Sequence, residues 1–185
     1  MTLAPTAGHA TAASGSLLRA PPVEAIAWHW SGDELGSYRS PRTVSDGELE
    51  CTFTYDEAAR RATTVCASGG RELWRNYEPY PFVEDATLLL DRGTLYSARF
   101  SDIVTGCTLY AFDARTGVLR WRTPLVGAAP EAIKRGPVAR GKYLNAVQIR
   151  MIRGRPVVFG WESAARYVEA VDPATGADAY HAIVR

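Results

Sequence analysis

Two stretches of the chain share one pattern: Ala111–Trp121 reads AFDARTGVLRW, and Ala170–Tyr180 reads AVDPATGADAY. Both follow the frame Ala-x-Asp-x-x-Thr-Gly-x-x-x-aromatic. An Asp at the end of a strand can accept N–H bonds from the turn that follows it, and Gly closes such a turn with a positive φ. The pattern therefore predicts two hairpins whose register is set by the turn, built on Asp113, Thr116, Gly117 and Trp121 and on Asp172, Thr175, Gly176 and Tyr180.

A fainter copy ends at Gly70–Trp74, which keeps the Gly and the aromatic residue four positions later. The aromatic residues Trp74, Trp121 and Tyr180 are 47 and 59 positions apart. Blade-type repeats have periods of about 40–50 residues, so the first interval fits and the second requires an inserted loop. Each large ring is expected to pack between neighbouring sheets.

The rest of the chain is also divided into short apolar or alternating runs, separated by turn signals such as Asp46-Gly47 and Asp91-Arg92-Gly93. Many runs are rich in β-branched and aromatic residues, which suit a pleated sheet, so an all-β fold of antiparallel strands is expected. The expected strands are Val23–Trp30, Leu49–Tyr55, Arg61–Ala67, Glu72–Tyr77, Ala86–Leu90, Thr94–Phe100, Thr108–Asp113, Val118–Thr123, Leu144–Ile152, Pro156–Trp161, Arg166–Val171 and Ala177–Val184.

Composition and length indicate one folded, soluble domain, which we place at residues 23–185: 46% of the 185 residues are hydrophobic, and the 21 basic and 20 acidic side chains nearly cancel. Residues 1–22 are rich in Ala, Thr, Pro, Ser and Gly, and we expect them to form a flexible, disordered tail. No apolar run approaches the about 20 residues of a spanning helix, and no signal peptide is recognised. A cytoplasmic location without membrane contact is therefore expected, with the mature form of an exported protein as the alternative.

The segment Leu109–Trp121, which contains the first copy of the pattern, resembles the repeat of the pyrroloquinoline-quinone-like β-propellers. In that family this stretch forms the third and fourth strands of a blade. The resemblance implies propeller-like blades near residues 49–80, 86–125 and 143–184. It implies little about activity, because such propellers include quinoprotein dehydrogenases as well as scaffolds without a cofactor. We find no residues that would hold the quinone, so no cofactor is expected.

The number of blades is a problem for a closed propeller, which typically needs four to eight, whereas residues 23–185 supply about three. Three arrangements follow from this shortage. Copies of the chain join by their strand edges into a homo-oligomer, the chain forms a small closed β-sandwich or barrel, or it is a fragment of a larger assembly.

The three cysteines, Cys51, Cys66 and Cys107, are odd in number and have no C-x-x-C spacing. Such a set predicts neither a disulfide framework nor a thiolate zinc site. We expect three reduced and mostly buried thiols.

Motifs of nucleophilic, phosphate-binding or metal-dependent catalysis are absent from the sequence, so no catalytic or metal-binding residue is assigned. His29 and His181 lie in expected strands, and we interpret both as structural residues. A site assembled from loops would need one of these histidines beside a carboxylate, which keeps an enzyme as an alternative.

Charge is distributed unevenly, because residues 1–92 carry a net charge of −5 and residues 93–185 carry +6. The segment Lys134–Arg155 contains seven cations and no acidic residue, and guanidinium groups suit phosphates and carboxylates. It is the candidate surface for an anion or a protein partner, with nucleic acid less favoured, unless its cations meet the acidic half of the chain or of a second copy. The cations are Lys134, Arg135, Arg140, Lys142, Arg150, Arg153 and Arg155.

The repeated hairpins and the missing catalytic motifs together favour a non-enzymatic β-propeller-like module for protein interaction or assembly. It would act on a protein partner or on copies of itself through its loops and strand edges. Two alternatives stay open: an enzyme with a loop-assembled site that uses His29 or His181, and a binder of polyanions or nucleic acid through Lys134–Arg155.

Overall fold

The structure is a computed structural model that describes residues 42–56, 58–59, 61–78, 86–100, 107–125, 144–162 and 165–184. These residues form three four-stranded antiparallel sheets and no helix. We name the sheets A, B and C in chain order, and each is a simple meander in which consecutive strands are neighbours.

Sheet A consists of β1 (Thr43–Ser45), β2 (Leu49–Asp56), β3 (Arg61–Ser68) and β4 (Arg71–Glu78). Sheet B consists of β5 (Ala86–Asp91), β6 (Thr94–Phe100), β7 (Cys107–Asp113) and β8 (Leu119–Pro124). Sheet C consists of β9 (Leu144–Ile152), β10 (Arg155–Glu162), β11 (Ala165–Val171) and β12 (Asp178–Val184).

Tight turns explain why the strands pair antiparallel with their sequence neighbours. Between β5 and β6 the chain reverses through Arg92 and Gly93, which have φ angles of 43° and 72°. Two consecutive positive φ values are the signature of a type I′ turn, whose twist matches that of the strands it joins. The hairpin register then places Asp91 opposite Thr94.

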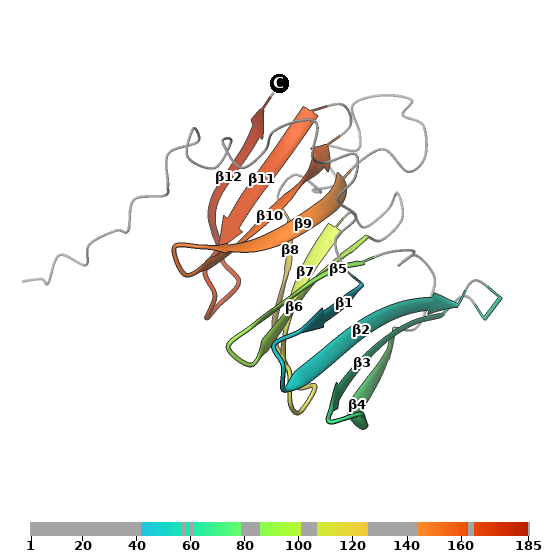
Figure 1. Cartoon of the computed structure of the whole chain (residues 1–185). Coiled ribbons are helices and arrows are strands. Elements are labelled where there is room, and N and C mark those ends of the chain that lie inside the picture. Colours follow the sequence, from blue (N-terminus) through green and yellow to red (C-terminus); the bar gives the residue numbers. More distant parts are fainter. Residues whose placement is uncertain are drawn as a thin grey trace, which may run out of the picture.

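The three sheets follow one another in a stack, with sheet B between sheets A and C (Figure 1). The first strands of the sheets, β1, β5 and β9, lie next to one another, so β4, β8 and β12 form the outer edges of the stack. The expected all-β, antiparallel, propeller-like architecture is therefore confirmed. The alternative of a small barrel is wrong for the described strands, because the three sheets stay separate and do not close on one another.

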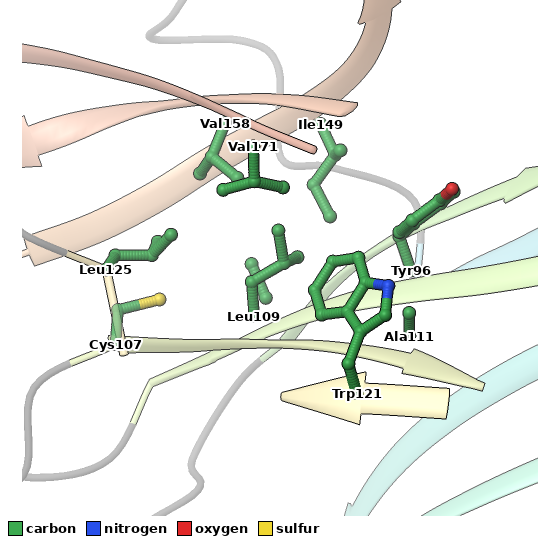
Figure 2. Packing of buried hydrophobic residues seen from close by; sticks show 10 residues of the cluster. Tyr96, Cys107, Leu109, Ala111, Trp121, Leu125, Ile149, Val158 and Val171 are labelled. Carbon is green, nitrogen blue, oxygen red and sulfur yellow. The ribbon is translucent and has the colours of Figure 1, made fainter. Parts of the chain in front are cut away.

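Two apolar layers hold the stack together. Between sheets A and B, Leu49 and Phe53 pack with Leu88, Leu95 and Phe112. Between sheets B and C, side chains from both sides meet in a second layer (Figure 2). That layer is formed by Tyr96, Cys107, Leu109, Ala111, Trp121 and Leu125 of the sheet B segment and by Ile149, Val158 and Val171 of sheet C.

The cysteines differ from expectation, because Cys51 and Cys66 form a disulfide. They lie directly opposite each other on β2 and β3, with Cα atoms 4.1 Å apart. The prediction of three reduced thiols was wrong because their separation of 15 residues becomes a contact only through the hairpin register. Cys107 is free and buried, and its burial raises the pKa of its thiol.

Candidate functional site

The two Asp-x-x-Thr-Gly turns have the same hydrogen bonds. Asp113 Oδ1 accepts from the backbone N–H groups of Arg115 at 3.1 Å and Thr116 at 3.0 Å, and from the Thr116 hydroxyl at 3.0 Å. Asp172 Oδ1 accepts the equivalent three bonds at 3.0, 2.9 and 3.0 Å. Gly117 and Gly176 both have a φ of +73°, which few residues other than glycine adopt.

These bonds hold the carboxyl groups in the ionised form. The Arg120 guanidinium, which donates to Asp113 Oδ2 at 2.8 Å, and the Thr116 donors lower the pKa of Asp113 to about 2. The backbone N–H and the hydroxyl of Thr175 likewise lower the pKa of Asp172. A charged acceptor strengthens each turn, since hydrogen bonds to an ionised group are about twice as strong as neutral ones.

Each turn also receives an aromatic ring from the preceding sheet. The Trp74 indole of sheet A donates its N–H to the Ala114 carbonyl at 2.8 Å, and the Trp121 indole of sheet B donates to the Pro173 carbonyl at 2.9 Å. The rings cover the turn glycines so closely that a Cβ at Gly117 or Gly176 would stand 2.7 or 2.5 Å from a ring carbon. The sequence pattern predicted a ring between sheets but did not show that the ring lies on the turn of the next repeat.

In both contacts the tryptophan belongs to one sheet and the turn belongs to the next sheet along the chain. Trp74 of sheet A contacts sheet B, and Trp121 of sheet B contacts sheet C. Tyr180 holds the equivalent position at the outer edge of sheet C and packs against the apolar residues of that sheet. Sheet A has no equivalent turn for a ring, because β3 and β4 are joined by Gly69 and Gly70 alone. Open space surrounds both of these glycines.

A buried cation joins sheets A and B. Arg99 on β6 is 1% exposed, and its Nη2 donates to the Thr64 hydroxyl of β3 at 3.2 Å. Its guanidinium lies 4.6 Å from the ring centre of Tyr110 and 5.2 Å from that of Phe112. Burial lowers the pKa of Arg99 to about 10, so the side chain stays protonated at neutral pH. We assign it a structural role.

The structure places three of the seven predicted cations on one hairpin, β9–β10, with Arg153 exposed at its turn. Arg155 lies close enough to Asp172 to lower the pKa of that carboxyl group. Lys134, Arg135, Arg140 and Lys142 lie outside the described residues. Neighbouring arginines at the same ends of the strands form ion pairs, which are Arg92–Asp91 at 3.1 Å, Arg120–Asp113 at 2.8 Å and Arg115–Glu48.

Of the two histidines considered for catalysis, only His181 is described, and His29 lies outside the described residues. His181 Nδ1 lies 2.8 Å from Asp178 Oδ2 on the exposed surface of β12. Within the described ranges, no group of three His, Cys, Asp or Glu residues could hold a metal ion. None of the described segments forms a helix long and apolar enough to cross a membrane.

The outer faces of the two terminal sheets differ. On sheet A, the side chains that point away from sheet B are mostly polar and exposed, and they include Glu50, Thr54, Arg61, Arg75 and Tyr77. On sheet C, the corresponding face holds an apolar group that we call the outer cluster. It consists of buried Val157, Phe159, Val168 and Ala170, with Ile152, Tyr180 and Ala182 packed against them.

The outer edge strands differ in charge as well. β4 carries Arg71, Glu72, Arg75 and Glu78. β8 carries two arginines and ends in Pro124, whereas β12 carries Asp178 as its only Asp, Glu, Lys or Arg. Charges and proline on an edge discourage the pairing of further strands. Among the described strands, none pairs with the open side of β4, β8 or β12.

No protein-family model matches the chain, and no curated protein sequence matches it. Several solved structures resemble its fold. A europium-containing methanol dehydrogenase has a TM-score of 0.52 at 12% identity, over 80% of this chain and 26% of that one. A quinohemoprotein alcohol dehydrogenase from Pseudomonas putida HK5 has a TM-score of 0.50 at 16% identity, over 78% and 20%. BamB from Moraxella catarrhalis superposes less well, with a TM-score of 0.40 at 12% identity over 76% and 44%.

The chain thus spans about a quarter or less of the two dehydrogenases that it matches. At this level of identity the similarity concerns the fold alone, and it agrees with the three stacked sheets. The described residues have the fold of part of a pyrroloquinoline-quinone-like β-propeller.

Proposed function

We propose that this protein is a non-enzymatic assembly module of the β-propeller type, in which a second copy of the chain pairs with the outer edge of β12. The observation that carries the proposal is the contrast among the three outer edges. β12 spans Asp178–Val184 and has one charged residue, whereas β4 has four. An uncharged edge exposes backbone N–H and C=O groups that can accept another strand.

A second copy is the partner best suited to this edge. Antiparallel pairing of β12 with the β12 of a partner subunit satisfies both edges in one two-fold interface. Asp178 lies at the start of the strand, so such pairing would place the two Asp178 carboxylates at opposite ends of the ribbon. Seven paired residues cover roughly 24 Å, so the two charges would not repel each other strongly.

Solution mass at several protein concentrations, with two matched lysine substitutions, tests the proposal. His181→Lys adds a charge to the middle of β12, and Tyr77→Lys adds one to the already charged β4. We expect the unmodified chain and the Tyr77→Lys variant to form dimers. His181→Lys should be monomeric, because the two lysines would lie opposite each other. An unmodified chain that stays monomeric at all concentrations, or a dimer that His181→Lys leaves intact, would contradict the proposal.

The two other functions have less support. His181 has a carboxylate neighbour, but both side chains are more than a third exposed and so lack the dry surroundings in which acid–base groups are usually tuned. A polyanion site would rest on Arg153, because Arg155 lies beside Asp172 and the arginines of neighbouring turns form ion pairs. Salt-dependent binding of heparin tests for that site. An Arg153→Glu variant that binds heparin as tightly as the unmodified chain would argue against it.

The predicted cytoplasmic location stays a prediction. The Cys51–Cys66 bond supports an oxidising compartment instead, because cytosolic reductants keep such pairs as thiols. Blocking free thiols in denaturant at the moment of lysis, so that buried thiols also react, and weighing the protein would decide between the two. We expect one blocked thiol, at Cys107, if the compartment is oxidising, and three if it is reducing.

A further inference from the structure

His181 and Asp178 form an oriented pair on the edge strand β12. His181 Nδ1 lies 2.8 Å from Asp178 Oδ2, and both side chains are more than a third exposed. A carboxylate can only accept a hydrogen bond, so Nδ1 of the neutral imidazole carries the proton and donates it to this bond. The other ring nitrogen, Nε2, then keeps its lone pair. Histidines that bind metal ions commonly have this arrangement, in which the second nitrogen donates to a carboxylate.

A single chain does not complete a metal site around this nitrogen. On the β11 side His181 lies opposite Glu169, whose side chain is fully buried and therefore closed to an ion from solvent. Within the described ranges, no three His, Cys, Asp or Glu residues of one chain are grouped so that they could hold a metal. Among the described residues, a further ligand is therefore available only from another molecule, across the outer edge of β12.

The antiparallel pairing of two β12 strands brings such a ligand. β12 has seven residues from Asp178 to Val184, so His181 is its central residue, and the two-fold axis of a centred pair passes between two copies of His181. Residues directly opposite each other in an antiparallel pair share a face, and their Cβ atoms are about 4.5–5.5 Å apart. Two nitrogens bound to one tetrahedral zinc ion, each about 2.0–2.1 Å from the metal, lie roughly 3.4 Å apart. Rings on neighbouring strands reach this separation by leaning toward each other.

We propose that two copies of His181, one from each chain, bind a zinc ion at the centre of the β12–β12 interface. The inference rests on the edge pairing of the proposed function and adds a ligand that strengthens it. Imidazole nitrogen is a good ligand for zinc. The two Asp178 carboxylates, one beside each ring, balance the charge of the ion and hold the rings in place. The two histidines leave the other positions of the tetrahedral ion to water.

Solution mass measured in zinc chloride and in EDTA tests the site. The readout is the ratio of the dimer dissociation constants in the two conditions, which separates the effect of the metal from the strength of strand pairing. If only the dimer holds the ion, zinc at about ten times its own dissociation constant should lower the dimer dissociation constant about tenfold. Titration calorimetry should give one zinc ion for two chains. Magnesium chloride should have no effect, because Mg²⁺ prefers oxygen ligands.

Three variants assign the zinc effect to this site. His181→Gln should lose it, because glutamine lacks the imidazole nitrogen. Asp178→Asn keeps the ligand but should weaken zinc binding by about tenfold or more, since the hydrogen-bond partners of metal-binding histidines contribute that much to affinity. The double variant His9→Gln with His29→Gln removes the other two histidines of the sequence and should retain the full effect.

The outcomes separate the metal site from the edge pairing. A chain that dimerises equally in zinc and in EDTA, a zinc effect that His181→Gln retains, or one zinc ion for each chain would overturn the metal site and leave the pairing of β12 intact. A chain that is monomeric in both conditions would overturn both. A chain that is monomeric in EDTA and dimeric in zinc would support the metal site, and it would contradict pairing without the metal.

Discussion

The outer faces of the two terminal sheets of the stack are opposite in character, because that of sheet A is polar and that of sheet C is apolar. Sheet A turns a polar face outward, where Arg61 lies 4.7 Å from the ring centre of Tyr77 and Arg75 pairs with Glu72 at 2.5 Å. Sheet C turns an apolar cluster outward, and that cluster is buried. Blades in the middle of a propeller are covered on both faces, and terminal units of repeat proteins need a polar outer face. Sheet A therefore has the outer face of a terminal repeat unit, whereas sheet C has the outer face of an interior blade.

The turns show the same difference. Sheets B and C each offer an Asp-x-x-Thr-Gly turn that receives a tryptophan from the sheet before it. The β3–β4 turn of sheet A contains only Gly69 and Gly70, and nothing lies within 4 Å of a Cβ built on either. Sheet A thus lacks a site for a preceding blade, which agrees with its polar outer face.

Removal of a large side chain from each outer face is the strongest test of this comparison. Phe159→Ala should destabilise the protein by about 3–5 kcal/mol, because it leaves a cavity in a buried cluster. Tyr77→Ala should cost at most about 1 kcal/mol, because Tyr77 is 49% exposed and loses mainly its contact with Arg61. Chemical denaturation followed by tryptophan fluorescence measures both. Similar costs for the two substitutions would mean that the outer cluster is not covered.

The disulfide should stabilise the sheet A end by a comparable but smaller amount. Cys51→Ala with Cys66→Ala removes a link between residues 15 positions apart, for which a loss of about 3 kcal/mol is expected. The effect should appear as faster amide exchange in β2 and β3 and not in β10 and β11. Cys107→Ala is the control for loss of a buried sulfur without loss of the link. Equal acceleration in sheets A and C would show that the bond does not act on one end of the stack.

The Asp-x-x-Thr-Gly turn of sheet C, which contacts a tryptophan ring, and the β3–β4 turn of sheet A, which does not, can be compared by the same glycine-to-alanine change in each. Gly176→Ala and Gly70→Ala both place a Cβ at a positive φ, +73° and +77°. Only Gly176→Ala also drives the Cβ into the Trp121 ring, 2.5 Å away. We expect Gly176→Ala to cost about 2 kcal/mol more than Gly70→Ala in chemical denaturation. Equal losses would mean that the ring does not lie on the turn.

The smallest expected effect is the contribution of the Asp-x-x-Thr-Gly turns to the pH dependence of stability. The pKa of Asp113 falls from its ordinary 3.8 to about 2 in the folded protein. Its contribution to stability is therefore complete above about pH 4 and disappears as the pH falls toward 2. Asp113→Asn should flatten the stability profile in this window, by less than about 1 kcal/mol because the carboxyl group is partly exposed. Denaturation curves between pH 2 and 5 that are parallel for both proteins would contradict this.

The parts of the fold that depend on local sequence were predictable. Asp113 and Gly117 act within their own turn, so the frame around them predicted the hairpins and the resemblance to a propeller blade. The three blade-like units were implied by that resemblance.

Contacts between distant residues were not predictable in the same way. Cys51 meets Cys66 only through the pairing of β2 and β3, and Trp74 meets Ala114 only after sheets A and B stack. In the sequence, Arg99 occupies an ordinary position in a strand. The hydroxyl and aromatic groups that its guanidinium contacts come mostly from other strands. Among the candidate cations, Arg155 comes near Asp172 only after β10 pairs with β11.

Thiol labelling of one cysteine placed on each outer face tests the difference between the ends most directly. Thr54→Cys lies on the exposed face of sheet A and Val168→Cys lies within the outer cluster of sheet C, while the Cys51–Cys66 bond and the burial of Cys107 keep the native sulfurs out of reach. Under native conditions we expect the cysteine at position 54 to react as fast as a free thiol, and the cysteine at position 168 to react only when the protein opens. Equal rates at the two positions would contradict the account.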